Sequence, residues 1–264
     1  MCKDCGCSGH HHEHAHHGGV HSHDHSHGMH THTRPDGTTY THVHDPAEKR
    51  EIAIGSAILS ANDQLASENR GWFRARKVKA FNLISSPGSG KTTLLVKLLE
   101  KLAAQNIKCA VIVGDQYGDI DAVRMKKACN AVTQIETLSS CHLDAARVQA
   151  VLEDAVPENT DILFIENVGN LVCPVAFDLG ENAKIALLST PEGEEKPLKY
   201  PALFAAAELV LLTKCDLAEA LEWDYEQTLK NIKQVNPDAQ VLQISAKKEE
   251  GLEALIEFFV KKLN

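Results

Sequence analysis

The segment at residues 85–93, SSPGSGKTT, constrains the fold of this chain more than any other part of the sequence. It directly follows the apolar run Phe81–Ser85 and leads into residues 91–104, which have the pattern of a helix. In a strand–loop–helix unit of this kind, glycines let the backbone N–H groups turn toward one point, and the helix adds its positive dipole end. The segment therefore predicts an anion-binding loop within an α/β fold.

The rest of the chain after residue 46 alternates short apolar runs with helical patterns. We predict strands at Phe81–Ser85, Ala110–Gly114, Ile162–Glu166, Ile185–Ser189, Leu209–Thr213 and Val241–Ile244. We predict helices at 47–70, 91–104, 119–129, 142–154, 222–235 and 249–263. Near-continuous apolar strands alternating with helices are typical of a mostly parallel sheet covered on both faces. The predicted fold class is therefore α/β, a mostly parallel sheet flanked by helices, in one domain at residues 47–264.

The segment 85–93 matches the Walker A loop of P-loop NTPases except at its first position, where Ser85 stands in place of glycine. Lys91 would reach the β- and γ-phosphates of a nucleotide, and the Thr92 hydroxyl would ligate Mg²⁺. The alternative is a chance turn rich in glycine and serine, which the order of strand, loop and helix disfavours. The expected phosphate-binding residues are Gly88, Ser89, Gly90, Lys91, Thr92 and Thr93.

Two acidic residues close apolar strands further along the chain. Glu166 ends the run Ile162–Glu166 and has Gly169 three residues later, as a Walker B carboxylate followed by a γ-phosphate-sensing loop would have. Asp115 ends an earlier strand and is a second candidate near the metal. The alternative for each is a polar residue that merely caps a strand. We expect the catalytic residues to be Lys91, Thr92, Asp115 and Glu166.

A base-recognition signal follows a later strand. Residues 213–216 read TKCD, which resembles the NKxD motif of GTPases with Thr213 in place of asparagine. The Asp216 carboxylate would accept hydrogen bonds from guanine N–H groups that adenine lacks, and the Lys214 stem would lie over the base. Ser245 and Ala246 begin an SAK sequence that resembles the loop contacting the guanine carbonyl. A four-residue motif is often a coincidence, but its order after a phosphate loop predicts GTP rather than ATP.

Fourteen of the 15 histidines fall within the first 44 residues. Such a segment has too few apolar residues to offset its conformational entropy, so we predict that residues 10–46 form a disordered tail and linker when metal-free. The formal charge of −9 argues against a nucleic-acid partner bound through a basic surface. No apolar run is long enough for a membrane helix, and the N-terminus does not resemble a secretion signal. We therefore expect a cytoplasmic protein with reduced cysteines.

Two groups of residues have the composition of metal sites. Cys2, Cys5 and Cys7 supply three thiolates within residues 1–9, enough for Zn²⁺ or Ni²⁺ with one more donor. The alternatives are unpaired thiols here and a merely solvated histidine tract beyond. His142, the histidine outside the tail, directly follows Cys141, and a Cys–His pair of this kind is most often structural.

The N-terminal CxxCGC, the histidine tract, SSPGSGKTTL, VGDQ, SCHLDA, ENVGNLVCP and TKCD together resemble the HypB family of GTPases, which help deliver nickel to [NiFe]-hydrogenase. The resemblance covers the whole chain and implies a SIMIBI-class G domain, slow GTP hydrolysis and a nucleotide-dependent homodimer. It also implies HypA and the hydrogenase large subunit as partners. By residue, it implies a nickel site at Cys2, Cys5 and Cys7 and a nickel or zinc site at Cys141, His142 and Cys173.

Other functions compatible with these residues belong to different classes. One is a nickel or zinc storage protein in which the nucleotide domain is regulatory. Another is a P-loop kinase, for which we find no acceptor-binding region, or an accessory GTPase for a different nickel enzyme such as urease. The CxxCGC terminus and the Cys141–His142 pair favour the hydrogenase-related function over the urease-related one.

Overall fold

The computed structural model describes residues 29–33, 38–43, 46–115, 120–138 and 140–263. The chain forms two units, residues 1–60 and 61–264. In the first unit, β1 (Met29–Thr33) and β2 (Thr39–Val43) pair as an antiparallel hairpin. The sequence analysis predicted disorder for these ten residues, whereas the structure pairs them as strands. Threonine, tyrosine and valine favour strands even in a polar sequence. The rest of the predicted metal-binding tail lies outside the described residues.

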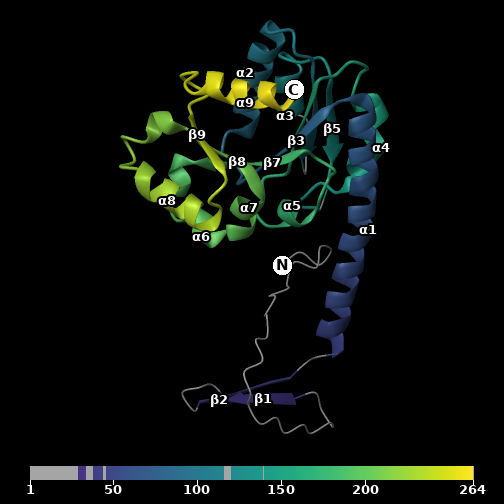
Figure 1. The fold of residues 1–264 in the computed structure, drawn as a ribbon, viewed down its shortest axis with the longest axis vertical. Coiled ribbons are helices and arrows are strands. Elements are labelled where there is room, and N and C mark those ends of the chain that lie inside the picture. Colours follow the sequence, from purple (N-terminus) through teal and green to yellow (C-terminus); the bar gives the residue numbers. More distant parts are fainter. Residues whose placement is uncertain (1–28, 34–37, 44–45, 116–119, 139, 264) are drawn as a thin grey trace. The chain divides into compact units, whose positions relative to one another are not determined.

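The second unit is built on one parallel sheet of seven strands in the order β5-β4-β6-β3-β7-β8-β9 (Figure 1). These strands are β3 (Lys79–Ser85), β4 (Cys109–Asp115), β5 (Val132–Glu136), β6 (Ile162–Glu166), β7 (Ala183–Ser189), β8 (Ala207–Thr213) and β9 (Gln240–Ile244). The α/β class predicted from the alternating runs is confirmed. β5 is the strand that the sequence analysis did not predict, because its sequence VTQIE lacks an apolar/polar alternation.

Helices cover both faces of this sheet, as Figure 1 shows. One face packs against α2 (Lys91–Ala104), α3 (Ile120–Met125) and α9 (Leu252–Leu263). The other packs against the end of α1 (Pro46–Arg76), α4 (Ala145–Ala155), α7 (Pro201–Ala206) and α8 (Tyr225–Val235). The remaining short helices are α5 (Cys173–Ala176) and α6 (Lys196–Lys199).

Four helices, α3, α4, α8 and α9, begin later than the sequence pattern suggested, and capping explains the later start of α4 and α8. Asp144 accepts a hydrogen bond from the Arg147 N–H at 2.8 Å, so α4 begins at Ala145 rather than at residue 142. Asp224 accepts in the same way from the Gln227 N–H at 2.9 Å, so α8 begins at Tyr225. The later start of α4 leaves Cys141 and His142 on the preceding loop.

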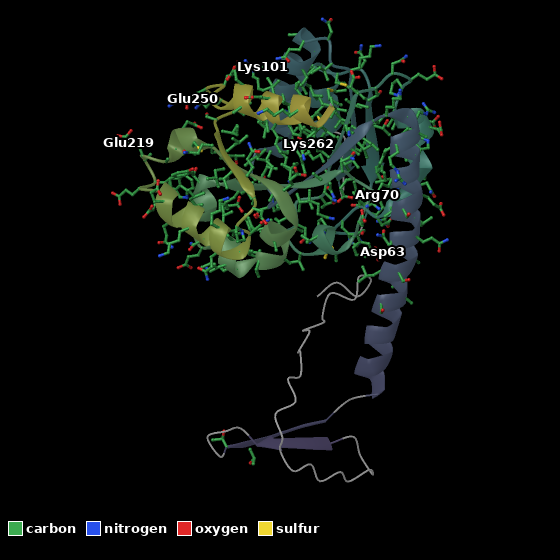
Figure 2. All side chains as sticks on the ribbon, viewed as in Figure 1. Asp63, Arg70, Lys101, Glu219, Glu250 and Lys262 are labelled. Carbon is green, nitrogen blue, oxygen red and sulfur yellow. The ribbon has the colours of Figure 1, made fainter. Side chains whose placement is uncertain are left out.

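Charged side chains cover the outside of the second unit, among them Lys101, Glu219 and Lys262 (Figure 2). Several form ion pairs, such as Lys101 with Glu253 at 3.4 Å. Within the described ranges, no helix is both long enough and apolar enough to cross a membrane. Because all seven strands are parallel, their carboxyl ends meet at one edge, and the loops that leave this edge hold the predicted site residues.

Candidate functional site

The phosphate loop turns at two glycines with left-handed backbone angles, Gly88 at φ 74° and Gly90 at φ 97°. Behind the loop, the buried Lys91 donates from Nζ to the Ser85 hydroxyl at 2.7 Å. Ser85 also shares a hydrogen bond with the Ser89 hydroxyl. Serine at the first position of the motif therefore gives the lysine a partner that glycine lacks. Burial lowers the pKa of Lys91, and the nearby Glu166 carboxylate opposes this shift.

Thr92 and Glu166 lie together beneath this loop. The Thr92 hydroxyl donates to Glu166 Oε1 at 2.9 Å, whereas Oε2 is buried without a hydrogen-bond partner among the described residues. Burial raises the pKa of the Glu166 carboxyl to about 7, although Lys91 and Thr92 both favour its ionised form. A hydroxyl beside an unpartnered carboxylate oxygen suits a hard divalent cation such as Mg²⁺.

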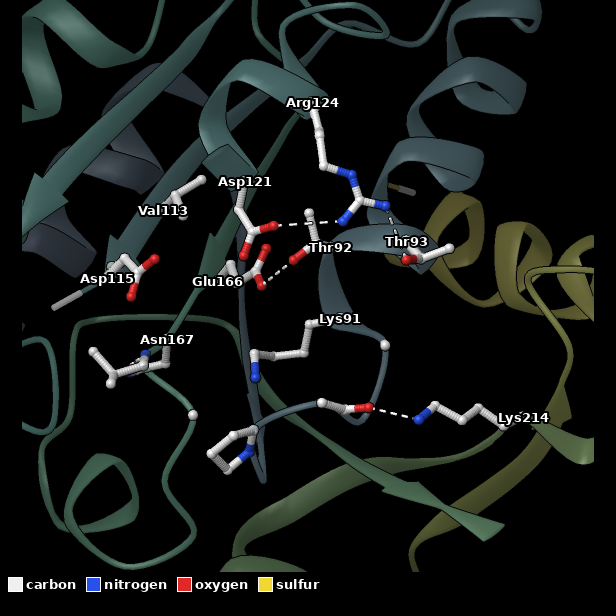
Figure 3. A pocket seen from close by; sticks show the side chains of 16 residues that line it. Lys91, Thr92, Thr93, Val113, Asp115, Asp121, Arg124, Glu166, Asn167 and Lys214 are labelled. Atoms are coloured by element: carbon white, nitrogen blue, oxygen red, sulfur yellow. Dashed lines mark hydrogen bonds and ion pairs between the residues drawn. The ribbon is translucent and has the colours of Figure 1, made fainter. Parts of the chain in front are cut away.

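A cavity of about 590 Å³ opens over these groups (Figure 3). Asp115 lies on its wall, together with two residues that the sequence analysis did not predict, Asp121 and Arg124. Arg124 donates to the Thr93 hydroxyl at 3.2 Å and lies 3.6 Å from the Asp121 carboxylate. Their spacing of three residues on one helix was the available signal, but charged pairs at this spacing are common on solvated helices.

The loop after Glu166 lies directly against the phosphate loop. A Cβ atom built on Gly169 would lie 3.0 Å from the backbone and ring of Pro87, so a side chain at this position would press on the phosphate loop. The distance agrees with the expectation that residues 166–169 sense the phosphate, which stays a prediction.

The predicted base-recognition residues form a second cavity, of about 320 Å³, beside the first. The Thr213 hydroxyl donates to the Ser89 carbonyl at 2.7 Å, and Lys214 Nζ donates to the Gly88 carbonyl at 2.6 Å. These bonds fasten the TKCD segment to the phosphate loop even though threonine replaces asparagine.

Asp216 and Ala246 line the same cavity. The Ser245 hydroxyl donates to Asp216 Oδ1 at 2.7 Å and itself accepts from the Lys248 N–H at 3.1 Å. Asp216 is thereby held beside a hollow of limited size, where a carboxylate would select among bases by their N–H groups.

Cys141, His142 and Cys173 converge in the folded chain, and their ligating atoms all lie within 4.8 Å of one another. The Cys141 Sγ is 3.8 Å from His142 Nδ1. The His142 ring stacks on Phe177 with the ring centroids 3.9 Å apart. Burial lowers the pKa of His142, which favours the neutral imidazole that metals bind. The other predicted metal site, at Cys2, Cys5 and Cys7, lies outside the described residues.

Comparison with known proteins gives consistent matches. The family described as "CobW/HypB/UreG, nucleotide-binding domain" matches residues 79–243. The hydrogenase maturation factor HypB of Rhizobium leguminosarum bv. viciae is 47% identical over 218 residues, which cover 83% of this chain and 73% of that protein. The hydrogenase/urease maturation factor HypB of Helicobacter pylori is 36% identical over 218 residues, covering 81% and 89%. A crystal structure of HypB from Helicobacter pylori in complex with nickel has a TM-score of 0.72 at 36% identity, covering 77% of this chain and 95% of that one.

Proposed function

This chain belongs to the family of HypB hydrogenase maturation factors, and on that basis we propose that it is a GTP-hydrolysing metallochaperone that assists nickel insertion into [NiFe]-hydrogenase. One observation carries the proposal. Cys173, which lies with Cys141 and His142, follows four residues after Gly169, which packs on the phosphate loop. A single short segment therefore connects the nucleotide cavity with a cluster of metal-binding side chains.

In the nucleotide cavity, the backbone of the phosphate loop and Lys91 would hold the phosphates and offset their negative charge. Thr92, Glu166 and Asp115 would hold Mg²⁺, which supplies electrostatic stabilisation of the charge that develops on the transferred phosphate. The unpartnered Oε2 of Glu166 supports this assignment. Asp216 would accept from the guanine N–H groups, and the Lys214 stem would cover the base.

Nickel is the cargo in this proposal, bound by Cys141, His142 and Cys173. Three donors leave a fourth position open, as transfer to an acceptor requires, and thiolate and imidazole donors also accept Zn²⁺. The proposal includes a second nickel site at Cys2, Cys5 and Cys7. It also includes storage of further nickel ions by the histidine tract. It divides the chain into a metal-binding motif at residues 1–9, a histidine-rich tail and linker at residues 10–46, and a GTPase domain at residues 47–264.

We infer that the working form is a nucleotide- or metal-dependent homodimer in the cytoplasm, with HypA and the hydrogenase large subunit as partners. Membership of the family supports these inferences. A role in urease maturation is the second candidate function, because the printed name of the Helicobacter pylori relative includes urease. A storage function for nickel or zinc is a further alternative for the tail.

The proposal is tested by measuring hydrolysis of GTP and of ATP by the purified full chain. We expect slow hydrolysis of GTP and none of ATP. Lys91→Ala is expected to abolish hydrolysis, because the phosphates lose their main cationic partner. The matched control is Lys101→Ala, which removes from the same helix a half-exposed lysine that pairs with Glu249 and Glu253, away from the cavity. Equal hydrolysis of ATP, or an active Lys91→Ala protein, would contradict the assignment.

A further inference from the structure

Three buried polar side chains form a chain of hydrogen bonds inside the domain. Asn82 Nδ2 donates to Glu181 Oε1 at 3.1 Å, and Asn167 Nδ2 donates to Asn82 Oδ1 at 3.2 Å. Their exposed fractions are 0% for Asn82, 1% for Asn167 and 7% for Glu181. We infer that this Glu181 relay, defined as Glu181, Asn82 and Asn167, is a positioning device that transmits the state of the nucleotide loop to the metal-binding residues. The inference rests on the proposed function and adds a regulatory connection to it.

The first end of the relay is fixed by the Glu181 carboxyl group, which meets donors at both of its oxygens. Glu181 Oε2 accepts from the Leu179 N–H at 2.7 Å, and Lys184 Nζ lies 3.0 Å from Oε1. The carboxylate therefore requires Asn82 to turn its amide NH₂ toward Oε1. The Asn82 oxygen then faces Asn167.

The other end of the relay is fixed by groups that can only donate. Because Asn167 must give its NH₂ to Asn82, its oxygen points the other way, where it accepts from the backbone N–H groups of Leu143 at 3.1 Å and Val168 at 3.0 Å. Each group in the relay has one allowed role, so the bonds have a single consistent direction. Leu143 directly follows His142, so the relay ends on the backbone next to a metal-binding residue.

The loop that carries Glu181 also holds His142 by its ring. Phe177 stacks on His142, and the chain reaches Glu181 four residues later. This segment is fastened to α1, because Arg70 Nη2 donates to both oxygens of Asp178, at 2.9 and 2.6 Å. Figure 2 labels Arg70 on the length of α1 beside the sheet. This anchored loop therefore supports His142 in two ways. Phe177 stacks on its ring, and Glu181 acts through the relay on the neighbouring Leu143 N–H.

The nucleotide loop meets the same relay at Asn167. This residue lies between Glu166, whose carboxylate accepts from Thr92, and the turn at Gly169 that packs on Pro87. A change of the phosphate that moves residues 166–169 moves the Asn167 oxygen as well. It then alters the hold on the Leu143 N–H and displaces His142 relative to Cys173. Glu181 and Asn82 act through Asn167 and touch neither ligand.

The test uses the full chain with Cys2, Cys5 and Cys7 replaced by alanine, so that thiolate-to-nickel absorption reports the site in the G domain. Absorption that persists in the same chain with Cys173→Ala is subtracted. Nickel is titrated in the presence of GDP and of a non-hydrolysable GTP analogue. The measured quantity is the ratio of the two nickel affinities, for which a coupling of about fivefold or more is typical.

Two single substitutions each introduce one mismatch into the relay. Glu181→Gln leaves an amide NH₂ facing a donor, either the Asn82 NH₂ or the Leu179 N–H, and Asn167→Asp places a carboxylate oxygen against the Asn82 oxygen. In the double variant, Asn82 can turn over, accept from the new amide at position 181 and donate to the new carboxylate at position 167. Both bonds within the relay are then restored in the opposite direction, while Lys184 Nζ loses its carboxylate partner. Asn182→Ala is the matched control, because Asn182 accepts from the Ala80 N–H at 2.8 Å in the same loop but lies outside the relay.

We expect the affinity ratio to fall toward one in each single variant and to recover in the double variant. Asn182→Ala should lower the melting temperature and keep the ratio of the parent protein. A parent-like ratio in Glu181→Gln, an equal loss in Asn182→Ala, or a double variant no better than either single would overturn the relay. If Glu181→Gln does not fold, Asn167→Asp provides the same comparison. If the parent protein itself has a ratio of one, nucleotide and nickel binding are not coupled, and both this part of the proposed function and the relay are refuted. If the parent protein shows coupling and the variants keep it, only the relay is refuted.

Discussion

Replacing Glu166 with glutamine is expected to stabilise the nucleotide-free protein while weakening its Mg²⁺-dependent binding of GTP. Burial raises the pKa of the Glu166 carboxyl to about 7 from its usual 4.5. Above pH 7 the folded protein therefore holds a carboxylate that would be better solvated in the unfolded chain. Glutamine has nearly the shape of the protonated carboxyl and does not ionise, so it removes this penalty together with the charge that would bind Mg²⁺.

The size of the effect follows from the difference between the two pKa values. Between pH 4.5 and pH 7 the folded state keeps a proton that the unfolded state has lost, so the free energy of unfolding falls as the pH rises. A difference of about 2.5 between the pKa values corresponds to about 3 kcal/mol, reached above pH 7 and absent below pH 4.5. For a domain of this size, about 2–4 °C per kcal/mol gives a rise in melting temperature of about 6–12 °C at pH 8.

The assay is calorimetric unfolding of both proteins from pH 4.5 to pH 8.5, without nucleotide and then with Mg²⁺ and GDP. Glu219→Gln, at an exposed position, is the control and should match the parent protein at every pH (Figure 2). A gain of the same size at pH 4.5 and pH 8 would show that packing, rather than the carboxylate charge, sets the stability. A gain at pH 8 with undiminished Mg²⁺-dependent stabilisation would refute the metal-binding role.

Three further predictions concern the base, the tail and the metal cluster. Asp216→Asn should weaken GTP binding about a hundredfold or more, measured by displacement of a fluorescent guanine nucleotide, because one hydrogen bond loses its charge and the other is replaced by an NH₂ group facing a guanine N–H. Deletion of residues 10–33 should lower the nickel stoichiometry in equilibrium dialysis at unchanged GTP hydrolysis, and nickel binding by these residues should be lost between about pH 7 and pH 5 as imidazoles gain protons. Cys173→Ala should weaken nickel binding and make the affinity equal in the GDP and GTP-analogue states, measured by spectroscopic titration.

The sequence predicted the sheet, and it indicated which loop residues line the two cavities, because both depend on local patterns. Six of the seven strands of the sheet have near-continuous apolar runs, and each predicted nucleotide-binding motif follows one of them. The exception, Val132–Glu136, is an edge strand with polar residues on both sides, where burial imposes little on the sequence. The hairpin of β1 and β2 was not predicted because the low apolar content of this segment indicated disorder, although its threonine, tyrosine and valine residues favour strands.

The metal cluster and the relay depend on contacts between distant parts of the chain. Cys141 and Cys173 are 32 residues apart, and spacing alone favoured a structural Cys–His pair. Their approach within 4.8 Å is a property of the fold, which places the loop before α4 beside the segment after β6. The sequence gives no sign that Asn82 and Glu181 belong to a site, because neither residue is part of a recognisable motif.

The magnitude of coupling limits what GTP hydrolysis can do to bound nickel. Coupling between two sites is typically about 1–3 kcal/mol, which changes an affinity by about 5–150-fold. Converting a site from 99% filled to 99% empty requires about 10⁴-fold. Under the proposed function, hydrolysis alone would therefore loosen a nickel ion at Cys141, His142 and Cys173 without emptying the site. The proposed function then requires an acceptor with better ligands to supply the remaining free energy, so nickel would be released only when the partner is bound. The fourth position that these three donors would leave open on nickel is where an acceptor's first ligand would enter.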